Sequence, residues 1–285
     1  MNFSTQKSLT SLIPCAVGIV FLLFPPALLA HGDSQEQIAA VNQEIAAHPN
    51  QPEFLLKRAE LHRLHGEFGL ALADCQKAEK TGPKSITTQF YRGKILFDAG
   101  LYPEARAALD RYLEVEREHS EAFLVRARVF AKLNNLERAA ADFSSGIRCA
   151  PTPEPDYFLE RAQVLEAAGK IETALAGLDE GIARLGPIVS LQLPAIDLEI
   201  KLKRYDAALK RIDLLAGQSQ RNESWLLRRA KILERAGRVE EARRAYADAA
   251  AAIHLLPDRL GKSDPVQEIQ KEVSTSLQRL AVRSP

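Results

Sequence analysis

An alanine recurs at a nearly constant interval along this 285-residue chain. The intervals are 34, 34, 35, 34 and 34 residues, and the positions are Ala71, Ala105, Ala139, Ala174, Ala208 and Ala242. A fixed period in this range is typical of solenoids, in which each period forms one helical hairpin. Because one hairpin cannot bury its apolar face alone, successive hairpins must stack. The pattern therefore favours one elongated, all-helical domain over two globular domains.

Other positions repeat in step with the alanine. Twelve residues before it stands a small residue in five of the six copies: Ala59, Gly93, Ala127, Ala162 and Ala230, with Ile196 in the fifth copy. Five residues before it stands a helix-ending residue in most copies: Gly66, Gly100, Asn134, Gly169 and Gly237, with Lys203 in the fifth. Small residues let helix axes approach closely, and glycine or asparagine adopts the left-handed conformation that ends a helix. Each period is therefore predicted to be two antiparallel helices joined by a tight turn.

These columns, together with prolines that close three of the units (Pro49, Pro83 and Pro151), resemble the tetratricopeptide repeat family. The resemblance covers six repeats, at 52–85, 86–119, 120–153, 155–188, 189–222 and 223–256. It implies an all-α, right-handed solenoid of antiparallel helix pairs. In that family the first helices of the pairs line a concave groove that holds an extended peptide or a helix of a partner protein.

Two capping helices are expected, one within residues 31–51 and one within 257–285, after a linker. Ser34 begins a capping-box pattern that predicts a short amphipathic helix over 34–47. Asp264 precedes a proline and reads as the N-cap of the final helix. The apolar face of that helix is predicted to consist of Val266, Ile269, Val273, Leu277 and Leu280.

Residues 1–30 have the pattern of a secretory signal peptide. Lys7 is their only charged residue, residues 12–24 are almost wholly apolar, and small residues favour cleavage after Ala30. We therefore expect an extracytoplasmic protein, periplasmic or secreted, without membrane insertion after cleavage. The alternative is an uncleaved anchor formed by residues 9–29, which is short for a bilayer span of about 20 residues.

Charge and motifs narrow the class of function. Loss of Lys7 from the 38 Lys and Arg leaves 37, which equals the 37 Asp and Glu, so the basic excess typical of nucleic-acid binders is lacking. No glycine-rich nucleotide motif, nucleophile motif or zinc-finger cysteine spacing occurs. We therefore expect a non-catalytic protein without a cofactor. Cys75 and Cys149 lie two repeats apart and are expected to be buried thiols rather than a disulfide.

Histidines offer an alternative function, the handling of copper or nickel. His62 and His65 are three residues apart on one predicted helix, with His48 nearby in sequence. Cleavage after Ala30 would make His31 the first residue, whose α-amine and imidazole together can chelate a metal ion. In the competing interpretation His62 fills a core position and His65 is solvated.

The candidate binding surface consists of two columns on the predicted first helices. The apolar column is Leu56, Phe90, Leu124, Leu159, Leu193 and Leu227. The polar column beside it is Glu60, Lys94, Arg128, Gln163, Asp197 and Lys231. A protein or peptide partner is predicted to contact the apolar column and Lys94, Arg128, Gln163 and Lys231, with Phe90, Leu124, Lys94 and Arg128 as the central contacts. Helix packing explains any single member of the apolar column equally well.

Overall fold

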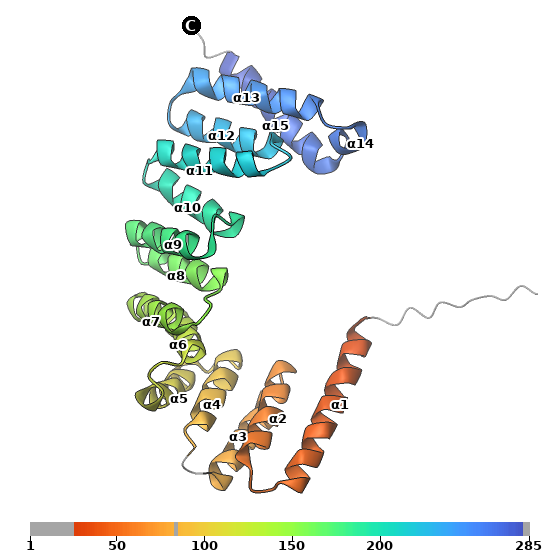
Figure 1. Ribbon diagram of the computed structural model, residues 1–285, viewed down its shortest axis with the longest axis vertical. Coiled ribbons are helices and arrows are strands. Elements are labelled where there is room, and N and C mark those ends of the chain that lie inside the picture. Colours follow the sequence, from red (N-terminus) through yellow and green to blue (C-terminus); the bar gives the residue numbers. More distant parts are fainter. Residues whose placement is uncertain (1–25, 83–84, 282–285) are drawn as a thin grey trace, which may run out of the picture.

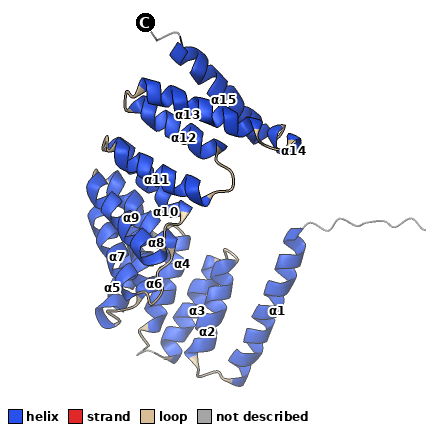
Figure 2. Cartoon of the chain, turned by 45° about the horizontal axis from the view of Figure 1, so that its top comes forward, coloured by secondary structure: helices blue, strands red, loops and turns tan. Residues whose placement is uncertain are grey.

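The computed structural model describes residues 26–82 and 85–281, and the side chains from residue 35 onward. Every regular element in these ranges is a helix (Figures 1 and 2). The predicted signal peptide lies outside the described residues except for its last five positions. In the part of the chain that is described, no helix combines the length and the apolar character needed to cross a bilayer.

Six helix pairs occupy the ranges of the predicted repeats. The first helices of the pairs are α2 (Pro52–Leu64), α4 (Thr87–Asp98), α6 (Ser120–Lys132), α8 (Pro155–Ala167), α10 (Val189–Lys201) and α12 (Glu223–Arg235). The second helices are α3 (Phe68–Thr81), α5 (Tyr102–Val115), α7 (Leu136–Cys149), α9 (Ile171–Leu185), α11 (Tyr205–Gln218) and α13 (Val239–His254). The pairs stack in chain order into a curved array, with α1 at one end and α14 and α15 at the other (Figure 1).

The turn within each pair has the same backbone geometry in all six repeats. Positive φ values between 56° and 77° occur at Gly66, Gly100, Asn134, Gly169, Lys203 and Gly237. The next residue donates its backbone N–H to a carbonyl five positions earlier, as from Asn135 to Phe130 at 2.8 Å. This bond pairs a carbonyl that the end of a helix leaves without a partner. Lys203 therefore has a left-handed backbone conformation that glycine would adopt without steric cost.

The repeating alanines and small residues form the seams of the core. All six alanines of the period have 0% of their surface exposed, as do Ala59, Ala127 and Ala230. A side chain added to Gly93 would meet Leu109 of the partner helix, so the close approach of α4 and α5 depends on its absence. The helix axes thus come together at the columns that the sequence identified.

The two ends of the stack are covered by additional helices. Helix α1 (Pro26–Ala47) begins at Pro26 rather than at Ser34, because proline is tolerated in a first helical turn and the helix continues through Gly32. At the other end α14 (Asp258–Gly261), which was not predicted, precedes α15 (Asp264–Ala281). The α15 side chains that pack on the last repeat include Val266, Val273 and Leu280, each with 1% exposed.

The fifth repeat departs from the others in its first helix. Pro194 lies inside α10, which nevertheless continues to Lys201. Ile196 replaces the usual small residue and is 3% exposed. The larger side chain at this position lies next to a cavity that is described below.

Candidate functional site

The apolar column belongs largely to the hydrophobic core. Four members are almost fully buried, with exposed fractions of 4% for Leu56, 6% for Phe90, 3% for Leu124 and 6% for Leu227. Leu159 and Leu193 are half-buried. The Phe90 ring lies 5.2 Å from the Tyr112 ring and 4.7 Å from the His119 ring. Burial favours helix packing for the four buried residues, and their contact with a partner stays a prediction.

The polar column is partly exposed, on the side of the stack formed by the first helices, which we call the first-helix face. Its N-terminal half forms ion pairs between repeats. Lys94 donates to Glu60 of the preceding repeat at 3.0 Å and lies 2.8 Å from Glu121 of the following repeat. Arg128 donates to both carboxylate oxygens of Glu160 at 2.7 Å. The cations predicted as ligand contacts in repeats two and three are therefore already neutralised by neighbours.

The pKa values of this network reflect the pairing. Burial disfavours the ionised form of Glu60, but hydrogen bonds from Arg63 and Lys94 outweigh it and lower the pKa of the carboxyl. Burial likewise disfavours charged Lys94, yet hydrogen bonds to Glu121 and Glu60 raise the pKa of its amine. Both groups are thus held in their charged forms by oppositely charged neighbours, Arg63 and Lys94 for the first and Glu121 and Glu60 for the second.

A column of arginines forms ion pairs between helices, and it was not predicted from the sequence. An arginine stands one residue before the small residue in five repeats: Arg58, Arg92, Arg126, Arg161 and Arg229. Arg126 donates to Asp142 of its own second helix at 2.7 and 3.0 Å, and to Asp110 of the preceding second helix at 2.9 Å. The 34-residue recurrence of arginine was the available signal. Because these arginines pair with neighbouring helices, they hold the stack together.

In the C-terminal half of the first-helix face, fewer charged side chains are paired with an opposite charge than in the N-terminal half. Gln163 and Asp197 are exposed. Lys231 pairs with Glu272 of α15 at 2.5 Å, and 43% of its side chain remains exposed. Asp197 has no ion pair or hydrogen bond from its side chain to any described residue. The two halves of this face therefore differ in available charge.

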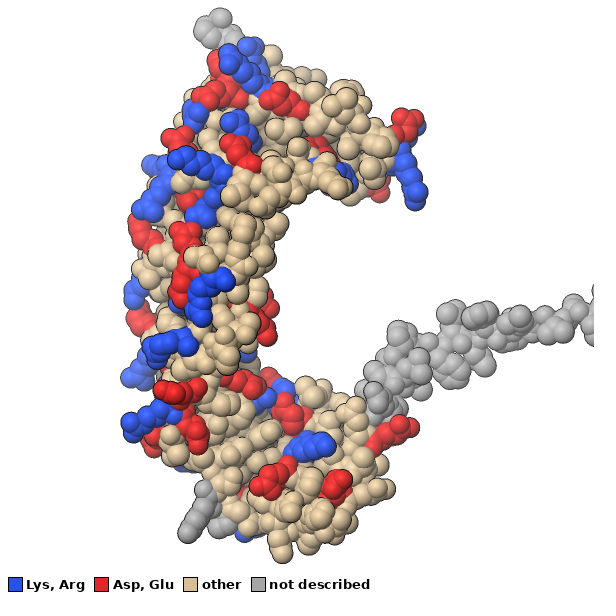
Figure 3. Space-filling view, viewed as in Figure 1, with Lys and Arg blue, Asp and Glu red and all other residues tan. Residues whose placement is uncertain are grey.

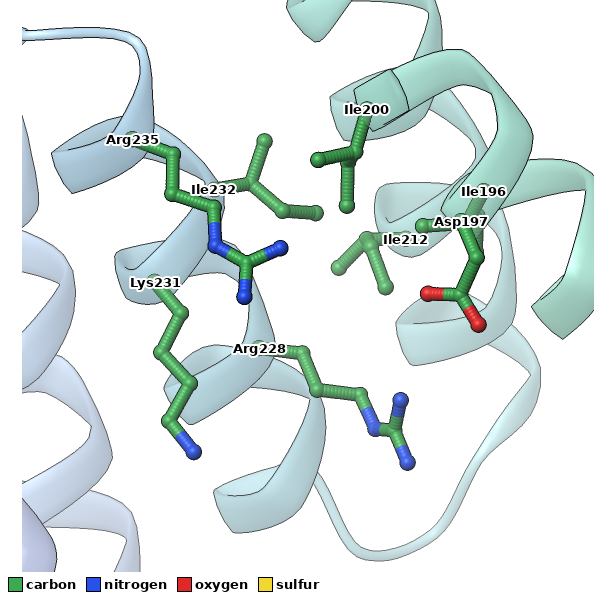
Figure 4. Close-up of a pocket in the computed structure, with 8 residues that line it drawn as sticks. All are labelled: Ile196, Asp197, Ile200, Ile212, Arg228, Lys231, Ile232 and Arg235. Carbon is green, nitrogen blue, oxygen red and sulfur yellow. The ribbon is translucent and has the colours of Figure 1, made fainter.

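Cavities follow the first-helix face where neighbouring first helices meet. One of about 190 Å³ is lined by residues of α2, α4 and α6, including Lys94 and Arg128. Another of about 320 Å³ lies mainly between α6 and α8 and includes Gln163. A third of about 130 Å³ lies between α10 and α12 above Ile212 of α11 (Figure 4). The face is therefore a row of shallow depressions.

Charged side chains of both signs are interspersed over the outer edge of the curve (Figure 3). The hollow of the curve is mostly uncharged in the same view. No region of this view carries charges of only one sign over several repeats, in keeping with ion pairing between helices.

The described histidines are not gathered into a common site. His62 Nδ1 lies 2.5 Å from Glu67 Oε2, and the His48 ring stacks on Phe54 at 5.6 Å. Among the side chains from residue 35 onward, no group of three or more His, Cys, Asp or Glu residues is placed to hold a metal ion. The side chain of His31 lies outside the described residues.

The two described cysteines are not bonded to each other. Cys75 is fully buried, and burial raises the pKa of its thiol to about 12. Cys149 is only half-buried, so the prediction of two buried thiols is wrong for this residue. Its position at the last turn of α7 leaves part of the side chain accessible.

Comparison with known proteins agrees with this architecture. The family model described as tetratricopeptide repeat matches residues 26–86, 92–152 and 193–257. No curated protein sequence matches the chain.

Solved structures with similar folds share little sequence with the chain. The C-terminal part of a tetratricopeptide repeat-containing protein from Cytophaga hutchinsonii has a TM-score of 0.61 at 15% identity, over 86% of this chain and 97% of that chain. A tetratricopeptide repeat protein from Parabacteroides merdae has a TM-score of 0.50 at 17% identity, over 87% and 95%. YrrB, described as a repeat protein with an unusual peptide-binding site, has a TM-score of 0.50 at 14% identity, over 70% and 97%. At these identities the likeness establishes the fold.

Proposed function

This chain belongs to the tetratricopeptide repeat family, and from that premise we propose that it is a non-catalytic adaptor that binds a segment of a partner protein on its first-helix face. Peptide binding is described for YrrB, and for this chain it is our proposal. Affinity would come from apolar contacts in the depressions and selectivity from the polar column.

The row of cavities along the first-helix face is the observation that carries this proposal. Each cavity opens between first helices of neighbouring repeats, and their lining combines apolar and charged side chains. Cavities that recur from repeat to repeat suit an extended or helical segment that places side chains into successive depressions.

We also propose that the adaptor works outside the cytoplasm. The support is the sequence of residues 1–30, with one lysine, an apolar core and small residues before Ala30. Cell fractionation and sequencing of the mature N-terminus test this point: a chain that begins at His31 in the periplasm or medium is expected. Retention of Met1 in a membrane fraction would instead indicate an anchor formed by residues 9–29.

Site-specific photo-crosslinking tests the location of partner binding. A photoreactive amino acid at Gln163, which is exposed on α8, is expected to crosslink a partner from the exported fraction of the host cell. The control carries the same amino acid at Arg111, which is exposed on the second helix α5. Both positions tolerate a new side chain because neither is buried.

A crosslinked protein that appears with position 163 and not with position 111 would support binding on the first-helix face. A product from position 111 alone would rule this face out as the docking surface, and equal products from both positions would contradict binding confined to it. Phe90 and Leu124 are unsuitable for such a test, because substituting buried residues changes the core itself.

A further inference from the structure

The cavity between α10 and α12 differs from the other depressions in the charges around it. Arg228, Lys231 and Arg235 follow one side of it on α12, at positions three and four residues apart that share one helical face. Asp197 of α10 lies opposite (Figure 4). Cations thus outnumber anions at this cavity three to one.

These cations are largely available to a ligand. Arg228 and Arg235 are exposed, and neither forms an ion pair with a described residue. The Arg228 guanidinium lies 6.0 Å from the centre of the Trp225 ring. This cation–π contact orients the guanidinium and leaves its charge unpaired. Of the three, only Lys231 forms an ion pair with a described residue, Glu272 of α15. Lys94 and Arg128, which occupy the position of Lys231 in repeats two and three, are fully paired, as described above.

The floor of the cavity is apolar. Ile212 and Ile232 are 1% and 3% exposed, and the side chains of Ile200, Ile212 and Ile232 point toward one another in Figure 4. The volume of about 130 Å³ approaches that of cavities of about 150 Å³ that accept benzene. There is room for one side chain the size of leucine or isoleucine.

We propose that this cavity is the specificity site of the adaptor, and that it recognises an acidic segment of a partner protein through one aliphatic side chain inserted among the isoleucines. The proposal rests on the adaptor function given above and names the chemistry of the partner. Carboxylates on either side of the inserted residue would pair with Arg228 and Arg235, which offer bidentate donors. Asp197 would accept a backbone N–H of the segment or repel a misplaced acidic residue.

Fluorescence anisotropy with a defined probe tests this assignment on the full chain. The probe is a labelled peptide with one leucine flanked on each side by two glutamates. Two control probes replace the leucine by glycine or the glutamates by lysines. The acidic, leucine-containing probe is expected to bind, with an affinity that falls as salt is raised. The lysine probe is expected not to bind.

Substitutions at the cavity test whether the acidic probe binds there. Arg228→Gln together with Arg235→Gln is expected to weaken binding of the acidic probe by about tenfold or more, since charge-assisted hydrogen bonds are lost. The matched control, Arg111→Gln with Arg244→Gln, removes two exposed arginines from second helices and is expected to leave binding unchanged. Ile200→Phe, which fills the cavity without changing charge, is expected to weaken binding of the leucine probe more than that of the glycine probe.

With the peptide probes, three outcomes would overturn the assignment: no binding of the acidic probe to a wild-type chain shown to be folded by circular dichroism, equal losses in the two double variants, or equal affinity for the leucine and glycine probes. None of these would affect a crosslink confined to position 163, so failure of this site and failure of the adaptor function are separable. A crosslink to a partner without acidic segments would likewise reject the site and keep the adaptor.

Discussion

Gly93 packs directly against Leu109: a Cβ added to Gly93 would lie 2.6 Å from the Leu109 Cγ. Leu109 is fully buried, so it has little room to move away. The contact joins the two helices of the second repeat, α4 and α5, at the column of small residues. It also explains why this repeat uses glycine at a position where four of the other five repeats use alanine.

Gly93→Ala is expected to lower the free energy of unfolding by about 1–2 kcal/mol, because overpacking of a core outweighs the gain in helix propensity. Gly217→Ala is the matched control, since no atom lies within 4 Å of the added Cβ in α11. It is expected to stabilise the chain by about 0.5–1 kcal/mol. Urea unfolding followed by circular dichroism measures both, and a stabilising Gly93→Ala would contradict the close contact.

Lys203→Gly is expected to stabilise the chain by up to about 1 kcal/mol. Lys203 has a φ of 57° and no side-chain partner among the described residues, so glycine removes steric cost without removing a contact. The greater freedom of glycine in the unfolded chain offsets part of the gain. Lys210→Gly, at an exposed position inside α11, should instead destabilise by about 1 kcal/mol. Similar urea midpoints for the two variants would argue against the left-handed turn.

Acidification is expected to remove the stabilising effect of Glu60. Its pKa in the folded chain is lowered from 4.5, so its contribution is present above about pH 4.5 and is lost as the pH falls through the lowered value. At neutral pH, Glu60→Gln should destabilise the chain by about 1 kcal/mol or less, since the pair is partly exposed. The difference from wild type should shrink as the pH falls below 4.5 and through the lowered pKa of Glu60. A difference that is independent of pH would mean that packing, not charge, accounts for the loss.

Thiol alkylation is expected to distinguish the two cysteines. Cys75 is fully buried with a pKa raised to about 12, so it carries almost no thiolate at pH 8 and is shielded from reagent. Cys149 is half-buried and should react. In a full-length Cys15→Ser chain, mass spectrometry should find one iodoacetamide adduct under native conditions and two in urea. Rapid native labelling of Cys75 would show that the first repeat opens.

The paired helices and their turns were predictable because their causes are local. A glycine or asparagine in the left-handed conformation ends a helix through bonds within six residues, so Gly66 or Asn134 identifies a turn without knowledge of the rest of the chain. Even Lys203, an exception in sequence, has the geometry predicted from its place in the period. The small residues were equally informative, since only they allow close helix contact.

The character of the first-helix face was decided by tertiary structure. The sequence showed that Leu56 and Phe90 share a column, but whether that column is core or surface depends on how neighbouring repeats rotate against each other. Likewise Lys94 and Lys231 occupy equivalent positions, while only the first lies between two carboxylates. Ion pairs and cavities of this kind join residues about one repeat apart, so their existence depends on distances between helices, which the order of residues along one helix does not specify.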